Sequence, residues 1–145
     1  MGDPVPVDRT TAVLSIHPQY VNRILAGTKT VELRKQPLPS MVRTVLMWRT
    51  GSDGGIVGKF TVDGQERLSV DDLLHLADVY PAAYGLGIEK APLRAYAEPT
   101  GGSLTSIDIG LVERFQCTER FGWTAGPQSF RYAPADWRTV LEVAW

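Results

Sequence analysis

Cysteine and histidine are scarce in this sequence, which holds one cysteine, Cys117, and two histidines, His17 and His75. A single thiol forms no disulfide within the chain, and the three side chains lack the clustered spacing of a zinc site. The sequence therefore predicts a reduced protein without a metal or cofactor. A chain of 145 residues needs neither to fold, because it buries roughly 68% of the surface that unfolding exposes.

Long apolar runs are also absent, and none approaches the roughly 18 residues that cross a bilayer. The first residues, MGDPVPVDRTT, carry acidic residues and prolines where a signal peptide has basic and then apolar residues. We therefore expect an unanchored cytoplasmic protein with no membrane partner. It would consist of a flexible lead over residues 1–11 and a single domain over residues 12–145.

The sequence has no overall excess of charge, since its net charge is −1. This argues against binding to long nucleic-acid duplexes, which reward a strongly basic surface. The charges are nevertheless unevenly distributed. Residues 17–59 hold seven basic and two acidic side chains, a local charge of +5, whereas residues 60–113 hold three basic and nine acidic ones, a local charge of −6. We expect a basic surface that attracts phosphate and an acidic surface open to a protein partner.

Hydrophobic periodicity and turn residues predict a mixture of strands and short helices. The expected strands span residues 12–17, 30–34, 44–50, 56–62 and 104–115, and the expected helices span residues 18–26, 70–80 and 92–97. Pro18 suits a first helical turn, Gly27 a left-handed C-cap and Ser69 an N-cap. Residues 116–135 are expected to be irregular, and Asp136 either caps a last short helix or leads into a strand. Because strands and helices do not alternate regularly, the predicted class is α+β, with a curled barrel of five to six mostly antiparallel strands flanked by about three short helices.

The most informative segment is residues 15–37, SIHPQYVNRILAGTKTVELRKQP. Lys29 lies at the start of the expected strand, and Glu32 and Arg34 follow on one strand face. Such a trio can bind a phosphate, hold the edge of a nucleobase or position an activated water. It can equally be a surface carboxylate between two cations, which contributes about 0–1 kcal/mol per pair and has no function.

Other side chains are of the types that contact nucleic acids. His17 is a candidate general base or a hydrogen-bonded residue at a helix start, and Gln128 can read a base edge or hold its own loop. An aromatic side chain can stack on an unpaired base; we expect core packing for Trp48 and leave both interpretations open for Trp123 and Tyr132. The full set of candidate binding residues is Ser15, His17, Lys29, Glu32, Arg34, Arg49, Gln128, Arg131 and Tyr132.

The segment from Leu14 to Arg34 resembles the opening of ASCH domains, which belong to the PUA-like superfamily. It reads LSI-x-P and then IL-x-G-x-K-T-x-E-x-R, and PQSF at residues 127–130 is similar to a later element of many ASCH proteins. The resemblance implies a PUA-like β-barrel with a cleft between the barrel and the first helix, into which the Lys-x-x-Glu-x-Arg motif points. The implied partner is single-stranded RNA or a modified nucleoside or nucleotide.

Two enzymatic branches of the family imply an alternative function. One branch deacetylates acetylcytidine with a Lys, a Thr and a Glu; Lys29 matches its Lys, but Glu32 stands at the position of its Thr. The other resembles a ribonuclease that uses the motif Lys with the Ser of the PQS element, here Lys29 and Ser129. The alternative is therefore a hydrolase with Lys29, Glu32 and Ser129 as candidate catalytic residues.

We prefer the binding function for two physical reasons. No nucleophile–base pair is evident from the sequence. In addition, a carboxylate at Glu32 would favour the charged form of Lys29 and oppose the lowered pKa that a general base needs.

Overall fold

The computed structural model describes residues 5–143. Its elements, in chain order, are β1 (Val7–Ile16), α1 (Pro18–Ala26), β2 (Val31–Arg34), β3 (Thr44–Arg49), β4 (Gly55–Ser69), α2 (Val70–Val79), α3 (Lys90–Ala97), the short 3-10 helix η1 (Glu98–Thr100), β5 (Ser103–Glu119), β6 (Phe130–Pro134) and α4 (Trp137–Val143). The expected ends of two helices are confirmed. Gly27 ends α1 with φ of 82°, and the Ser69 hydroxyl accepts a hydrogen bond from the Asp72 N–H at the start of α2.

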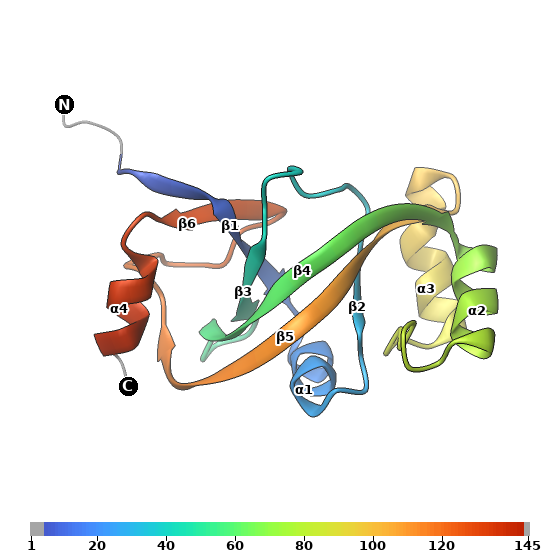
Figure 1. Cartoon of the computed structure of the whole chain (residues 1–145), viewed down its shortest axis with the longest axis horizontal. Coiled ribbons are helices and arrows are strands. Elements are labelled where there is room, and N and C mark those ends of the chain that lie inside the picture. The colour runs from blue at the N-terminus through green and yellow to red at the C-terminus, as the bar shows by residue number, and fades with distance from the viewer. Residues whose placement is uncertain (1–4, 144–145) are drawn as a thin grey trace.

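The described strands form one curled sheet in the order β2-β5-β4-β3-β1-β6 (Figure 1). Only β1 and β3 run parallel, and the other four neighbouring pairs are antiparallel. This arrangement confirms the α+β class with mostly antiparallel strands. It does not confirm the barrel, because β2 and β6 are edge strands and no ladder joins them.

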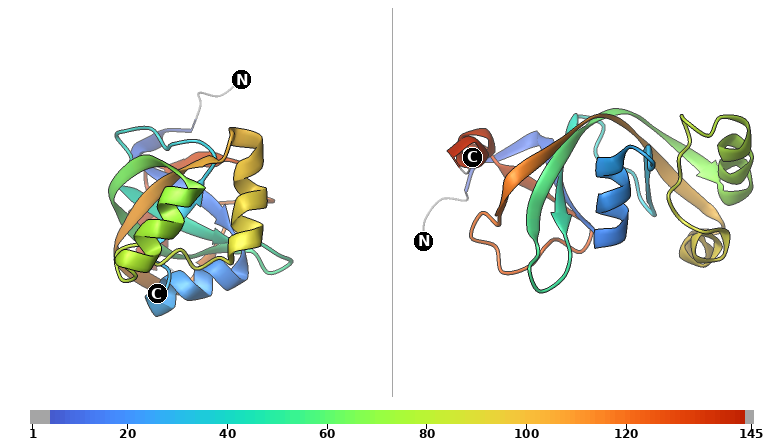
Figure 2. Two further views of the ribbon diagram at one scale, coloured as in Figure 1. Left: turned by 90° about the vertical axis from the view of Figure 1, so that its right-hand side faces the viewer. Right: turned by 90° about the horizontal axis from the view of Figure 1, so that it is seen from below.

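Three clusters of buried side chains hold helices on the sheet. Val45 and Met47 belong to the cluster that includes α1, whereas Leu46 and Trp48 belong to the cluster that includes α4. Because successive residues of a strand face opposite sides, α1 and α4 cover opposite faces of the sheet. A third cluster joins β2 and β5 to α2 and α3, which lie together at one end of the molecule (Figure 2).

The two ends of the chain differ from the expectation. Strand β1 begins at Val7, so the predicted flexible lead is wrong for residues 7–11; residues 1–4 lie outside the described part. The Asp8 carboxylate fixes this stretch, because it accepts hydrogen bonds from both Thr hydroxyls that follow it and from the indole N–H of Trp137. The segment after Asp136 is the helix α4, and its Trp137 contacts the start of β1 through Asp8.

The segment predicted to be irregular contains two strand portions. Strand β5 continues to Glu119, and β6 pairs antiparallel with β1 between Phe130 and Pro134. The irregular interpretation is therefore correct only for the loop between these strands. Strand β6 is only five residues long and is stabilised by pairing with β1, so its own pattern is a weak signal in the sequence.

Candidate functional site

A pocket of about 380 Å³ lies between the end of β1, the start of α1, β2 and α3. Its walls include six of the residues predicted from the sequence, Ser15, His17, Lys29, Glu32, Arg34 and Gln128. The remaining lining residues are Ile16, Tyr20, Leu33, Ile88, Pro92, Leu93 and Tyr96. A volume of this size is typical of small-molecule sites.

Lys29 is buried under the loop that connects α2 and α3, and only 3% of its surface is exposed. Its Nζ donates to the carbonyl oxygen of Leu86 at 2.5 Å. A Cβ atom at Gly87 would lie 2.8 Å from three carbons of the Lys29 side chain, so only glycine allows the loop to approach this closely. The loop therefore fixes the ammonium group at the pocket wall.

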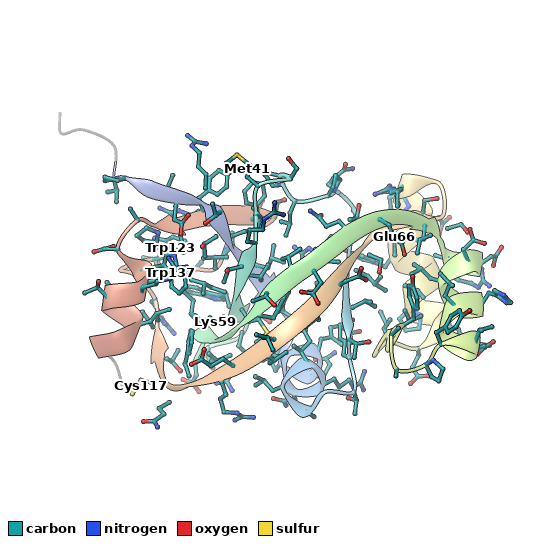
Figure 3. The ribbon with its side chains drawn as sticks, in the orientation of Figure 1. Met41, Lys59, Glu66, Cys117, Trp123 and Trp137 are labelled. Atoms are coloured by element: carbon teal, nitrogen blue, oxygen red, sulfur yellow. The ribbon has the colours of Figure 1, made fainter. Side chains whose placement is uncertain are left out.

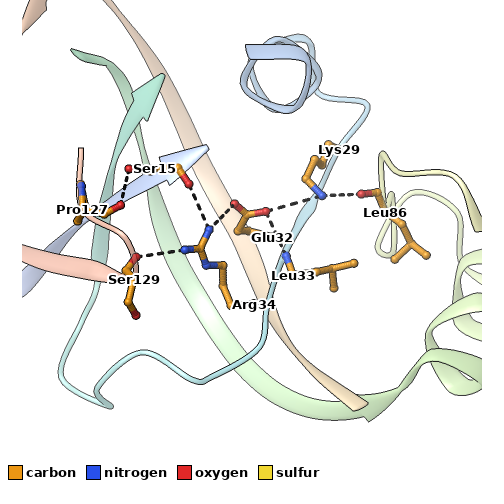
Figure 4. Close-up of polar contacts among 8 residues, drawn as sticks. All are labelled: Ser15, Lys29, Glu32, Leu33, Arg34, Leu86, Pro127 and Ser129. Atoms are coloured by element: carbon orange, nitrogen blue, oxygen red, sulfur yellow. Dashed lines mark hydrogen bonds and ion pairs between the residues drawn. The ribbon is translucent and has the colours of Figure 1, made fainter. Parts of the chain in front are cut away.

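Glu32 lies between two cations (Figure 4). Its Oε1 is 3.9 Å from Nζ of Lys29, and its Oε2 is 3.8 Å from Nη1 of Arg34. Glu32 is 5% exposed, which rules out the interpretation of a solvated surface carboxylate. The pocket thus presents a donor, an acceptor and a donor along one wall.

Burial lowers the pKa of Lys29, and the positive charge of Arg23 adds to this effect, whereas the negative charge of Glu32 raises it. The net direction is downward. Glu32 therefore opposes the lowered pKa of Lys29 as expected, but burial has the larger effect.

Two tyrosine rings line the pocket, and neither was predicted from the sequence as a site residue. Tyr20 comes from α1, with its ring centroid 5.5 Å from Nζ of Lys29. Tyr96 comes from α3. Burial raises the pKa of the Tyr96 hydroxyl, Arg34 lowers it and Glu32 raises it, with a net upward shift. The phenol is therefore neutral at physiological pH.

Arg34, at the end of the edge strand β2, connects this strand to β1 and to the residue before β6. Its Nη1 donates to the carbonyl oxygen of Ser15 in β1 at 3.3 Å, and its Nη2 donates to the carbonyl oxygen of Ser129 at 3.1 Å. Ser129 is exposed, does not line the pocket, and lies on the side of Arg34 away from Lys29 (Figure 4). The structure therefore does not bring Ser129 and Lys29 together.

Arg49, Arg131 and Tyr132 also lie outside this pocket. Arg49 ends β3, and the guanidinium of Arg131 lies 3.9 Å from the ring centroid of Trp123. Tyr132 is a residue of β6 rather than of a loop, and its ring packs against Phe130 at 5.2 Å. Strand pairing of β6 with β1 explains the positions of Arg131 and Tyr132, because successive side chains of a strand point to opposite faces of the sheet.

Trp48 and Trp123 stack on one another, with ring centroids 6.0 Å apart. Trp48 is buried as expected, and Trp123 packs against the same cluster as Trp137 (Figure 3). One face of the Trp123 ring therefore serves packing.

Residues 5–143 contain neither a membrane-spanning helix nor a cluster of metal-binding side chains. No helix there is both long and apolar enough to span a bilayer. No group of three or more His, Cys, Asp or Glu side chains in this part of the chain is arranged to hold a metal ion.

Comparison with known proteins gives a consistent family and fold. Residues 14–119 match the sequence model of the ASCH domain. The crystal structure of ASCH from Zymomonas mobilis has a TM-score of 0.78 and 21% sequence identity, covering 94% of this chain and 96% of that one. Crystal structures of two single-substitution variants of the Zymomonas mobilis protein have TM-scores of 0.77 and 0.74, each at 19% identity, and cover 96% and 92% of this chain and 99% and 97% of theirs. A comparison with curated protein sequences finds no match.

Proposed function

The chain belongs to the ASCH domain family, which is generally thought to bind RNA, and from this premise we propose that the pocket of Lys29, Glu32 and Arg34 binds a nucleobase of single-stranded RNA or a modified nucleoside or nucleotide. The observation that carries the proposal is the row of donor, acceptor and donor next to two tyrosine rings, in which Lys29 and Glu32 are buried and Arg34 is partly buried. A nucleobase combines a polar edge with two flat faces, and this wall complements both.

The polar edge of a base carries both N–H donors and carbonyl or ring-nitrogen acceptors. Glu32 accepts hydrogen bonds only, whereas Lys29 and Arg34 donate only. Together these three side chains can bind an edge that contains both kinds of group, and Gln128 offers one more of each. Phosphate alone would not need the buried carboxylate.

The pocket volume of about 380 Å³ suits one base rather than a duplex. A base within a duplex would have to leave the stack to enter, which costs a few kcal/mol. A single strand or a free nucleoside avoids this cost. This is the physical reason for preferring an unpaired ligand.

The test measures binding and turnover of two kinds of ligand by the protein. One is a fluorescently labelled single-stranded oligoribonucleotide of mixed sequence, and the other is a set of unmodified and modified nucleosides. Replacing Tyr96 by Leu removes one stacking surface and should weaken binding at least about fivefold, since base–aromatic stacking contributes about 1–3 kcal/mol. Tyr80→Leu is the matched control, because Tyr80 is 57% exposed and outside the pocket. Equal affinities for the two variants, or no binding by the unsubstituted protein, would contradict the proposal.

A hydrolase is the second candidate function, and the lowered pKa of Lys29 is the observation in its favour. A lysine acts as a general base only in its neutral form, which a lowered pKa makes more abundant. This candidate depends on Lys29 and Glu32, and Ser129 would contribute only if it moved past Arg34.

A further inference from the structure

A second cavity of about 530 Å³ adjoins the first one, and Ser15 lines both. Its walls are formed by Trp48, the loop after β3, Arg120 and residues 124–127. Pro127 lines the second cavity and Gln128 lines the first, and the Ser15 hydroxyl donates to the Pro127 carbonyl oxygen at 2.7 Å. The contact between Ser15 and Pro127 therefore separates two neighbouring cavities.

The indole N–H of Trp48 has no acceptor among the described residues, although Trp48 is only 3% exposed and lines this cavity. Two glycines of the cavity wall, Gly54 and Gly126, leave space in front of this nitrogen. A Cβ atom added at Gly54 would lie 3.2 Å from Nε1, and one added at Gly126 would lie 2.7 Å from Nε1. The indole N–H of Trp137, by contrast, donates to Asp8 at 2.9 Å. The nitrogen itself is accessible from the cavity rather than sealed in the core, so a ligand oxygen in the cavity can accept its hydrogen bond.

The remaining polar groups of the cavity supply positive charge and donors. Arg120 donates through Nε to the carbonyl oxygen of Gly54 and through Nη2 to that of Ser52. These bonds fix the guanidinium and leave three of its five N–H groups for a ligand. Hydroxyl donors come from Thr50, Ser52 and Thr124, since the Ser15 hydroxyl already donates to Pro127, and none of the described residues that line the cavity is acidic. An anion with several acceptor oxygens satisfies this set of groups.

We propose that the second cavity is a phosphate-binding subsite formed by Trp48 and Arg120, which holds the phosphate next to the base in the first pocket. The pairing of base and phosphate rests on the proposed function, whereas phosphate binding by the cavity does not. The phosphate can belong to the backbone of a strand or to the end of a single nucleotide. In either case a plain nucleoside fills only half of the combined site.

The experiment follows the indole N–H signals of the full-length, ¹⁵N-labelled protein by NMR during titration with inorganic phosphate. Trp48→Phe assigns the Trp48 signal by its loss, and the Trp137 signal is the internal reference. We expect phosphate to shift the Trp48 signal and not that of Trp137. Arg120→Gln should raise the phosphate Kd about tenfold, as expected for a hydrogen bond to a charged group. Arg114→Gln is the matched control, since Arg114 is an exposed arginine of β5 that lines neither cavity.

A second titration uses the labelled oligoribonucleotide, a dinucleoside monophosphate, a mononucleotide and a nucleoside. Tighter binding of the dinucleoside monophosphate than of the mononucleotide identifies a strand phosphate, and the reverse order identifies a terminal one. For the oligoribonucleotide, Arg120→Gln should reduce the slope of log K against log salt by about 0.7, the value for one phosphate contact on a single strand. The Arg114→Gln slope should equal that of the unsubstituted protein.

The outcomes separate the two proposals. If Tyr96→Leu weakens oligoribonucleotide binding but Arg120→Gln does not, and phosphate leaves the Trp48 signal unchanged, the phosphate subsite is wrong and the base pocket stands. If phosphate shifts the Trp48 signal while no nucleoside, nucleotide or oligoribonucleotide binds, the subsite stands and the proposed function is wrong. If Trp48→Phe fails to fold, the comparison of Arg120→Gln with Arg114→Gln still decides, because both residues are exposed.

Discussion

The ammonium nitrogen of Lys29 lies 3.9 Å from Oε1 of Glu32, and both side chains are buried. Glu32 offsets part of the cost of burying the ammonium group and, through its other oxygen, also faces Arg34. The carboxylate is thus the one negative charge between two positive ones at the pocket wall. Its removal should affect stability, ionisation and binding together.

Glu32→Gln should lower the free energy of unfolding by about 3 kcal/mol near neutral pH. The substitution keeps the shape of the side chain but leaves two cations without their shared partner, and breaking a buried ion pair from one side costs about this much. Urea denaturation measures the change.

Glu113→Gln is the matched control for this measurement. The Glu113 carboxylate lies 3.4 Å from Nζ of Lys59, but the two side chains are 58% and 32% exposed. An exposed pair contributes less than about 1 kcal/mol. Equal losses for the two variants would show that burial of Glu32 does not govern its contribution.

Lys29 should make stability depend on pH in the alkaline range. Its pKa is lowered from 10.5 in the folded protein, so between the lowered value and 10.5 the unfolded chain holds a proton that the folded chain has lost. The Lys29 contribution to the free energy of unfolding must therefore increase as the pH rises through this window, by up to about 1.4 kcal/mol per pH unit. It is fully present above 10.5 and is lost as the pH falls through the folded pKa.

The measurement is the free energy of unfolding of the unsubstituted protein minus that of Lys29→Met, at several pH values from neutral to alkaline. Other titrating groups cancel in this difference. A difference that stays constant with pH would mean that Lys29 has an ordinary pKa despite its burial.

Local signals in the sequence predicted what local structure determines. Pro18, Gly27 and Ser69 define helix ends through backbone geometry and hydrogen bonds within a few residues, and the structure has these ends where expected. The motif from Lys29 to Arg34 also lies in one pocket, because these residues occupy one short strand and its approach.

Tertiary packing determined what the sequence did not predict. Lys29 is buried by a loop more than fifty residues further along the chain, through Leu86 and Gly87. Tyr96 reaches the pocket because α3 packs against β2 in a separate buried cluster. Neither relationship leaves a periodic pattern or a motif, so the burial of the charges and the aromatic wall appear only in the structure.

Arg34→Lys should weaken the connection between β2 and the segment before β6. A lysine cannot reproduce the two hydrogen bonds that the planar guanidinium donates to Ser15 and Ser129. We expect faster amide hydrogen exchange in residues 128–132 and a loss of about 1–2 kcal/mol in the free energy of unfolding. Arg43→Lys, at an exposed position, is the control; unchanged exchange in the Arg34 variant would show that this bridge does not hold the segment.

The decisive comparison between a binding domain and a hydrolase uses Lys29→Arg and Lys29→Met, assayed for binding and for turnover of the same ligands. A ligand anchor needs a positive charge, so Arg should retain most of the affinity and Met should lose about tenfold, the value of one charge-assisted hydrogen bond. A general base needs a neutral amine, which Arg cannot provide because it stays protonated at any accessible pH.

Lys59→Met controls for the loss of a cation elsewhere, since Lys59 lies outside both cavities. Circular dichroism and urea denaturation show whether the Arg side chain fits beneath Gly87, which contacts the stem of Lys29. Affinity that survives in Lys29→Arg, with no turnover by the unsubstituted protein on any ligand that binds, supports the binding domain. Turnover by the unsubstituted protein that both substitutions abolish while Lys29→Arg still binds would make this ASCH domain an enzyme, with the lowered pKa of Lys29 as the physical basis of its activity.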